Sequence, residues 1–158
     1  VGTISSLWEA NMEVLDPEHS GIDIFDENWK IYSRNSGMTG HKIGSNAVVE
    51  NSMITDGCRI DGSIKHSILF SGVRVEKGAK IEDAVVMGKT VIKTGAVVEH
   101  CIVAENVVIG ENAVVGSMPK GEEHGVATIG SGITIGKGAK IGPNAMVNKN
   151  VEDGEEQW

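Results

Sequence analysis

Cysteine is scarce in this sequence. Only Cys58 and Cys101 occur in 158 residues, and neither belongs to a CxxC motif or lies among closely spaced histidines. A disulfide framework or a zinc site needs more cysteines or such spacings, so neither is expected. The two residues are predicted to be reduced core thiols of a cytoplasmic protein, and no metal site is predicted in this chain.

Positive charge is also in short supply. The formal net charge is -8 and the pI is about 5.1, so the molecule as a whole repels a phosphate backbone or an anionic membrane surface. No stretch reaches the roughly 18 apolar residues of a membrane span, and the first residues lack the pattern of a signal peptide. We therefore expect no nucleic acid partner and no membrane partner.

Aromatic residues make up only 4% of the sequence, whereas glycine occurs 21 times. The apolar residues are mainly Val, Ile and Ala. This composition favours many short strands and tight turns over a helix bundle.

Aliphatic residues recur at a nearly constant spacing through most of the chain. From residue 69 to residue 115 the steps are 6, 6, 5, 6, 6, 5, 6 and 6, so three steps add up to 17. The positions are Leu69, Val75, Ile81, Val86, Ile92, Val98, Val103, Ile109 and Val115. Similar series begin upstream at Ile43 and resume downstream at Ile129, and small or β-branched residues follow many of these positions at a distance of four.

A period of six fits neither an amphipathic helix nor one long strand, but it fits short strands separated by bends, three to a turn. The sequence thus predicts a mainly β chain: one parallel β-helix of about six coils over residues 41–151, with the aliphatic side chains inside. Residues 116–128 break the spacing and are predicted to form a loop excursion, after which the coils resume at Ile129.

The two ends differ from the repeat. Apolar residues from Ile4 to Leu15 recur at helical spacing behind Thr3, a suitable N-cap, and residues 29–33 alternate like a short lead-in strand. We therefore predict a first unit over residues 1–40, with a helix and this strand. Residues 152–158 are predicted to be an acidic tail that frays or caps the stack without extending it.

Three strings are more specific than the repeat: VGTI to WEANM at residues 1–12, WKIYS at 29–33 and HSILFSGV at 66–73. In order and spacing they resemble bacterial glucose-1-phosphate adenylyltransferase, over nearly the whole chain. The resemblance implies that the chain is the C-terminal portion of a longer protein, a left-handed β-helix at its junction with a catalytic N-terminal domain. The start at Val1 agrees with this expectation.

By this resemblance the parent enzyme uses Mg²⁺ to convert ATP and glucose 1-phosphate into ADP-glucose and pyrophosphate in glycogen synthesis. The family's catalytic motif and its metal-binding Asp have no counterpart in this chain, so no catalytic residue is assigned and the fragment alone is expected to be inactive. The expected partners are the parent's own catalytic domain and other subunits of a homo- or hetero-tetramer under allosteric control. A catalytically weak regulatory paralogue is an alternative parent.

The resemblance also suggests an effector surface, because the family's β-helix meets its catalytic domain beside residues 29–33. Lys30 and Arg34 flank this segment and are candidates for contact with an anionic effector. The other interpretation is a solvated strand edge. The arginines with which some members bind a sugar-bisphosphate activator are replaced here by Glu99 and His100, so that activator is not expected.

Histidines suggest two further possibilities. His66, Asp83 and His100 are spaced by 17 residues and should stack in one column, which is either an outward polar column or a proton or metal relay. A coil rise of about 4.8 Å places the two histidines roughly 10 Å apart, too far to share one ion directly. His124 in the excursion is the general-base candidate if the chain is instead a hexapeptide acyltransferase that uses acyl-coenzyme A.

Overall fold

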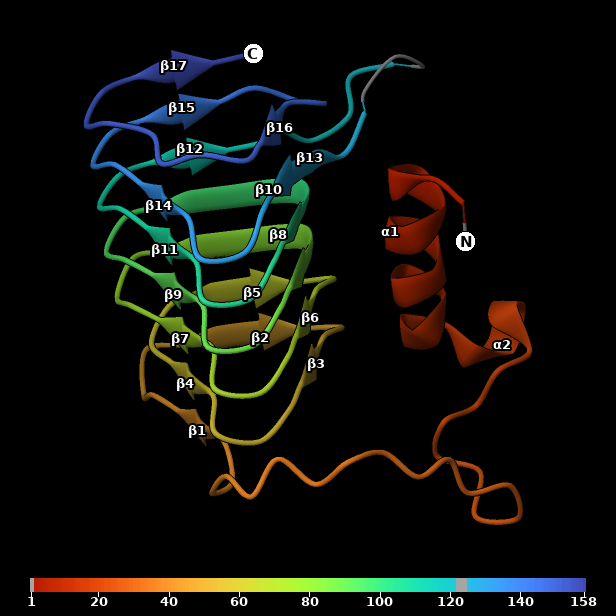
Figure 1. Cartoon of the computed structure of the whole chain (residues 1–158). Helices are drawn as coiled ribbons and strands as arrows, with labels where there is room; N and C mark the ends of the chain where they lie inside the picture. The colour runs from red at the N-terminus through yellow and green to blue at the C-terminus, as the bar shows by residue number, and fades with distance from the viewer. Residues whose placement is uncertain (1, 122–124) are drawn as a thin grey trace.

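The structure is a computed structural model that describes residues 2–121 and 125–158. Figure 1 shows a stack of short parallel strands, a parallel β-solenoid of about seven turns, with one helix standing beside it. The mainly β solenoid predicted from the six-residue period is therefore confirmed, with about one more turn than expected.

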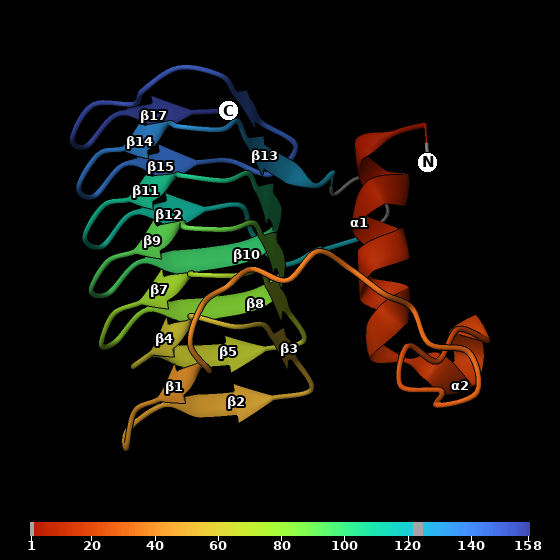
Figure 2. The same ribbon diagram turned by 60° about the horizontal axis from the view of Figure 1, so that its bottom comes forward.

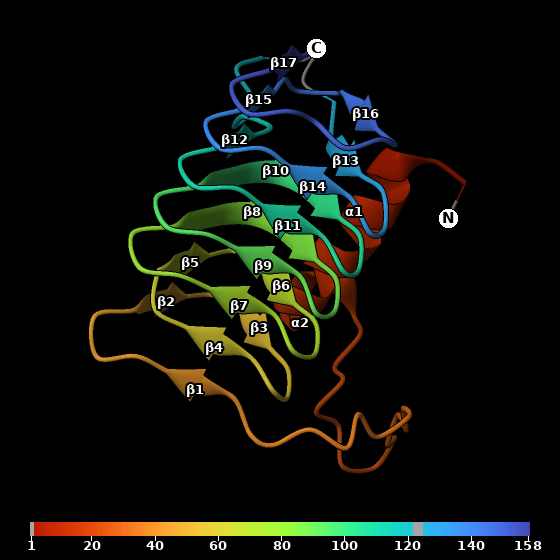
Figure 3. The same ribbon diagram turned by 60° about the vertical axis from the view of Figure 1, so that its left-hand side comes forward.

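The first face of the solenoid is a parallel sheet with one short strand from each coil, as Figure 3 shows. Its strands, in order, are β1 (Lys42–Ile43), β4 (Arg59–Ile60), β7 (Arg74–Val75), β9 (Val91–Ile92), β11 (Val108–Ile109) and β14 (Thr134–Ile135). The second residue of each pair points inward and belongs to the predicted spacing. The first points outward.

The other two faces share their longest strands. The second face consists of β2 (Val48–Glu50), β5 (Ser63–Lys65), the first half of β8 (Lys80–Val86) and of β10 (Val97–Val103), β12 (Val114–Val115), β15 (Lys140–Ile141) and β17 (Glu156–Gln157). The third consists of β3 (Met53–Ile54), β6 (Ile68–Leu69), the second halves of β8 and β10, β13 (Ala127–Ile129) and β16 (Met146–Val147). Both long strands therefore turn a corner between two faces.

The interior is a ladder of aliphatic side chains, as the spacing predicts. Ile60, Leu69, Ile81, Ile92 and Ile109 are fully or almost fully buried. The small residues four positions further on, such as Ala79 and Ala96, are buried in the same cluster. Each buried Val or Ile contributes roughly 1.5 to 3 kcal/mol, so this ladder is the main source of stability.

The excursion is shorter than predicted. Strand β12 ends at Val115, but Ala127 and Thr128 already belong to β13, where they pair with Cys101 and Ile102 of β10. The coils therefore resume two residues before Ile129. The reason is that β10 offers a partner for the whole of β13, including residues that the six-residue spacing does not mark.

The acidic tail is also different from the prediction, because it extends the stack. Strand β17 pairs with β15 in the same register as the coils below, with Glu156 opposite Lys140. The Lys140 Nζ atom lies 2.8 Å from Glu156 Oε1, so the negative charge has a partner in the adjacent strand. Trp158 then covers Gly142, where an added Cβ would lie 2.3 Å from the indole ring.

The N-terminal unit contains helix α1 (Ile4–Met12), a 3-10 turn η1 (Glu13–Leu15) and the short helix α2 (Pro17–Ser20). Thr3 is the N-cap, as predicted, and Ser6 completes a reciprocal capping box with it. The lead-in strand predicted at residues 29–33 is not formed, because residues 29–41 pair with no other strand. Figure 2 brings forward this extended segment between α2 and β1. No helix among the described residues is both long and apolar enough to cross a membrane.

Candidate functional site

The corner between the second and third faces carries the column of His66, Asp83 and His100. Their φ angles are 42°, 57° and 42°, in the left-handed region that Asn, Asp and His tolerate better than most residues. Asp83 and His100 occupy the middle of β8 and β10, so these residues make the bend by which each strand passes to the next face. Local backbone conformation thus explains the residue types at this corner.

The three side chains are joined by short hydrogen bonds. Asp83 Oδ1 lies 2.8 Å from His66 Nδ1, and Asp83 Oδ2 lies 2.6 Å from His100 Nδ1. An ionised carboxylate only accepts hydrogen bonds, so both Nδ1 atoms donate to it. The side chains of Asp83 and His100 are 12% and 8% exposed, and that of His66 is 38% exposed.

Helix α1 covers this corner. The indole Nε1 of Trp8 donates to the backbone oxygen of Asp83 over 2.9 Å, and the Trp8 ring lies 4.6 Å from the His100 ring, centroid to centroid. We call His66, Asp83, His100 and Trp8 the corner clamp. The column is polar and points outward, as one of the two interpretations predicted, but the N-terminal helix buries most of it.

Apolar contacts surround the corner clamp. Met12 packs with Val85, Ile102 and Val126 in a second core on the outside of the solenoid. Val85 and Ile102 are outward residues of β8 and β10 that would be exposed without the helix. Figure 1 shows why they are not, since α1 stands along the third face.

The corner clamp is best suited to holding the helix. An Asp-His pair can serve acid-base catalysis, but here Asp83 is divided between two imidazoles and one of them is packed under an indole. Among the described residues, no three His, Cys, Asp or Glu side chains are arranged to hold a metal ion. The contacts of the column therefore serve to hold the helix.

Both thiols are unreactive by environment. Burial raises the pKa of the Cys101 thiol, and the nearby charges of Asp83 and Glu99 act in the same direction. Burial likewise raises the pKa of the Cys58 thiol. Both cysteines are free and buried, as predicted for core thiols.

Only one of the two effector candidates lines a groove in the structure. Arg34 lines an open groove of about 690 Å³ together with Asp56, Phe70 and Ser71. Lys30 is exposed but does not line this groove. The acyltransferase candidate, His124, lies outside the described residues.

Large apolar side chains are exposed around the connection to the solenoid. Phe25, Trp29 and Tyr32 are all at least 74% exposed. At the first coil, the inward residues Ile43 and Val49 are also exposed, because no coil lies beneath them. Patches of this kind commonly mark contacts with other domains or chains.

A family profile described as GlmU-like, C-terminal hexapeptide matches residues 36–136. The chain belongs to this family. The matched range covers the lower coils, the corner clamp residues of the solenoid and the excursion.

A curated relative extends the assignment of this hexapeptide chain. This chain is 51% identical over 87 residues to the glucose-1-phosphate adenylyltransferase of Bacillus mycoides (strain KBAB4). The match covers 55% of this chain and 23% of that protein, so the chain spans about a quarter of its relative. The homology predicted from the three sequence strings is confirmed.

A solved structure gives a weaker likeness. The acetyltransferase domain of PglB from Neisseria gonorrhoeae FA1090 has 22% sequence identity and a TM-score of 0.37, covering 77% of this chain and 55% of that one. No functional argument rests on this likeness.

Sequence reasoning found the column of the hexapeptide solenoid but missed Trp8. The 17-residue spacing was enough to place three side chains together, because stacking depends only on the register of neighbouring coils. Trp8 is 75 residues away from Asp83. The apolar outward residues Val85 and Ile102 were the available signal, since an exposed face would not carry them.

Proposed function

We propose that this chain is the C-terminal β-helical part of a glucose-1-phosphate adenylyltransferase, the enzyme that joins ATP and glucose 1-phosphate to give ADP-glucose and pyrophosphate with Mg²⁺. The observation that carries the proposal is the 51% identity over 87 residues. In this role the chain performs no chemistry itself. It docks on the catalytic part and on neighbouring subunits in the cytoplasm.

The junction with the catalytic part is supported by the N-terminal unit. The corner clamp fixes α1 rigidly on the solenoid, so whatever precedes the helix is placed in a defined position. The exposed Phe25, Trp29 and Tyr32 then offer aromatic anchors to a neighbouring domain, the residue types that contribute most at interfaces.

A chimera tests this function. The C-terminal part of the Bacillus mycoides relative is replaced by residues 2–158, and pyrophosphate release from ATP and glucose 1-phosphate is measured with Mg²⁺. We expect the chimera to be active, the truncated relative to lose most of its activity, and the present chain alone to release no pyrophosphate. A chimera no better than the truncated relative would count against the proposal.

Subunit contact is supported by the open first coil. The edges of β1 and β2 are unpaired on their lower side, and Ile43 and Val49 are exposed next to them, whereas β17 and Trp158 cover the other end. We propose that a second subunit covers the first coil. Light scattering after size exclusion should find a dimer or larger, and Ile43→Asp should shift it toward monomer. A monomer at 100 µM would contradict this contact.

An anionic effector at Lys30 and Arg34 remains part of the proposal. Arg34 has Asp56 as a neighbour in its groove, so a phosphate-type ligand would have to outcompete that carboxylate. Charge reversal of both residues should weaken the binding of ADP or a sugar phosphate by the active chimera. Unchanged binding would remove these residues from the effector site.

A further inference from the structure

The second coil of the solenoid is two residues shorter than its neighbours. Arg59 pairs with Arg74 at a separation of 15 residues, whereas the pairs on either side, Lys42 with Arg59 and Arg74 with Val91, are separated by 17. The deficit lies in the turn between Ile60 and Ser63, which contains only Asp61 and Gly62.

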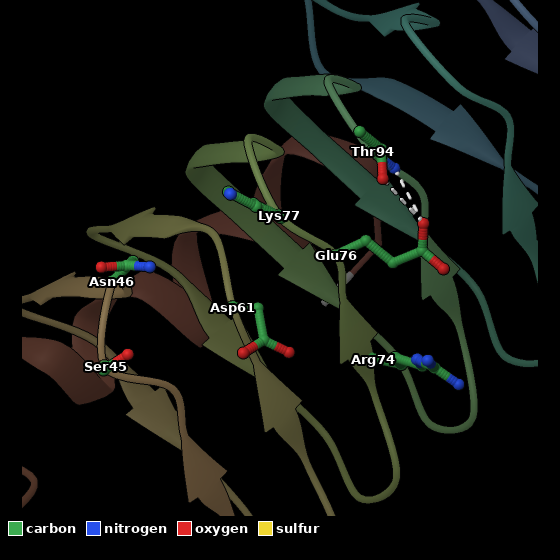
Figure 4. Close-up of a pocket in the computed structure, with 7 residues that line it drawn as sticks. All are labelled: Ser45, Asn46, Asp61, Arg74, Glu76, Lys77 and Thr94. Carbon is green, nitrogen blue, oxygen red and sulfur yellow. Dashed lines mark hydrogen bonds between the residues drawn. The ribbon is translucent and has the colours of Figure 1, made fainter.

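The short turn leaves a notch between the longer turns of the first and third coils. We call the space bounded by Ser45, Asn46, Asp61, Arg74, Glu76 and Lys77 the short-turn notch; its volume is about 290 Å³. A second hollow of about 250 Å³ shares Asn46, Asp61 and Lys77 with it and is also lined by Lys80. Figure 4 shows the lining side chains of the notch.

The backbone of the short turn packs closely against the third coil at Gly62. A Cβ atom on Gly62 would lie 2.5 Å from the backbone oxygen of Ala79 and 2.9 Å from that of Glu76. Only glycine permits this approach, so the second turn rests directly on the third coil. The notch is thus a fixed feature of the backbone and does not depend on a side-chain rotamer.

Several polar groups in the notch have no partner within the described part of the chain. The side chains of Asp61, Arg74 and Lys77 make no hydrogen bond or ion pair there. Glu76 is different, since its Oε2 accepts from the backbone N and the hydroxyl of Thr94 over 3.0 and 3.1 Å. The notch therefore offers two unpaired cations, one unpaired carboxylate and the amide and hydroxyl of Asn46 and Ser45.

The notch is lined by two cations, Arg74 and Lys77, and by two carboxylates, Asp61 and Glu76. Arg74 continues an outward column with Arg59 and Lys42, in register on adjacent strands, where like charges destabilise each other. Lys77 and Lys80 add charge at the turn. The basic side chains around the notch are therefore Lys42, Arg59, Arg74, Lys77 and Lys80, in a chain whose net charge is -8.

We infer that the short-turn notch binds a small phosphorylated sugar. Arg74 and Lys77 supply the charge-assisted donors that a phosphate needs. Asp61 and Asn46 supply the acceptors that sugar hydroxyls need, and a bare phosphate would gain nothing from Asp61. The inference depends only on the geometry of the notch and stands whether or not the proposed function holds.

Titration of the ¹⁵N-labelled chain tests the site, with glucose 6-phosphate, inorganic phosphate and glucose as probes at low ionic strength. We expect glucose 6-phosphate to shift the amide signals of residues 45–46, 61–63 and 76–78 saturably, at millimolar concentration because the site is open. Inorganic phosphate should bind several-fold more weakly, and glucose should cause no shift. Shifts that grow without saturation, or that are spread over all basic residues, would overturn the inference.

Two variants and a matched control sharpen the test. Arg74→Gln should weaken binding of glucose 6-phosphate about tenfold, as expected for one charge-assisted hydrogen bond. Arg59→Gln removes the same charge one coil lower, outside the notch, and should change it less than twofold; equal losses would show diffuse attraction and no site. Asp61→Asn should weaken the sugar phosphate while strengthening inorganic phosphate. An equal rise for both ligands would contradict sugar recognition.

Discussion

Replacing Asp83 tests whether the corner clamp holds helix α1 on the solenoid. Removing the carboxylate eliminates two charge-assisted hydrogen bonds, each worth roughly 1.5 to 3 kcal/mol in a buried setting. The bond to His100 counts nearly in full, because both side chains are largely buried. The bond to His66 is discounted, since that imidazole is more than a third exposed.

The left-handed backbone at Asp83 adds a second contribution that must be separated from the first. Alanine in this conformation costs about 1 to 2 kcal/mol, whereas asparagine and glycine adopt it more easily. We expect losses of about 1 kcal/mol for Asp83→Asn, which keeps one acceptor, about 2 to 4 for Asp83→Gly and about 3 to 5 for Asp83→Ala.

Lys89 provides the backbone control. Its φ of 58° is almost the same as the 57° of Asp83, and its side chain makes no hydrogen bond within the described part of the chain. Lys89→Ala should therefore change the stability little, because lysine already bears the left-handed strain, and Lys89→Gly should relieve roughly 1 kcal/mol of it.

Urea titration followed by circular dichroism gives the free energy of unfolding, and hydrogen exchange of residues 2–15 shows whether α1 is released locally. In the Asp83 variants the amides of α1 should exchange faster than those of β9. If Asp83→Gly and Asp83→Ala differ from Asp83→Asn by no more than Lys89→Ala differs from Lys89→Gly, the side-chain bonds contribute nothing and the clamp is refuted.

Three further predictions concern the rest of the chain. Ile92→Ala, in the fully buried ladder, should cost about 2 to 5 kcal/mol and speed hydrogen exchange in both adjacent coils; an effect confined to β9 would contradict shared coil stability. The bond from Lys140 lowers the pKa of Glu156 from 4.5, so its contribution to docking β17 is complete above that pH and is lost as pH falls through the lower folded value. The amide of Gln157 should lose protection in this range, but not in Lys140→Gln. Cys101, whose burial raises its pKa, should react with a thiol reagent in the native state only as fast as the solenoid opens.

The sequence predicted the solenoid well because its determinants are local. Each inward residue is fixed by a step of five or six along the chain, so Ile92 or Ile109 can be placed inside without knowing any distant contact. The same register placed His66, Asp83 and His100 in one column. The spacing does not reveal whether another segment of the chain covers the outside of a coil.

The errors share one physical cause, a partner that lies far away in sequence. Strand β17 forms because β15 offers it an edge for backbone pairing, with Lys140 opposite Glu156, although the tail alone is acidic. Residues 29–33 have strand composition, yet they pair with no strand within the described chain. The burial of Asp83 depends on Trp8. Composition and periodicity indicate local secondary-structure preferences, and they do not reveal these long-range pairings.

The departures from the spacing mark the features that differ between one coil and the next. The excursion leaves the stack after Val115. Gly116 lies beside the backbone of Glu99 and His100, so the excursion starts next to the corner clamp. The step of four from Ile60 to Ile64 produces the short-turn notch. A uniform ladder of coils needs neither of these two departures.

Lengthening the short turn of the second coil separates the stability of the coil from ligand binding in the short-turn notch. Replacing Asp61 and Gly62 by the four-residue turn of the next coil, residues 76–79, keeps Ile60 and Ile64 inward at a step of six and fills the notch. We expect circular dichroism and urea stability to change by less than about 1 kcal/mol, because the buried ladder is unchanged, while saturable binding of glucose 6-phosphate is lost. Binding retained by this folded variant would show that the short turn is only an irregularity of packing.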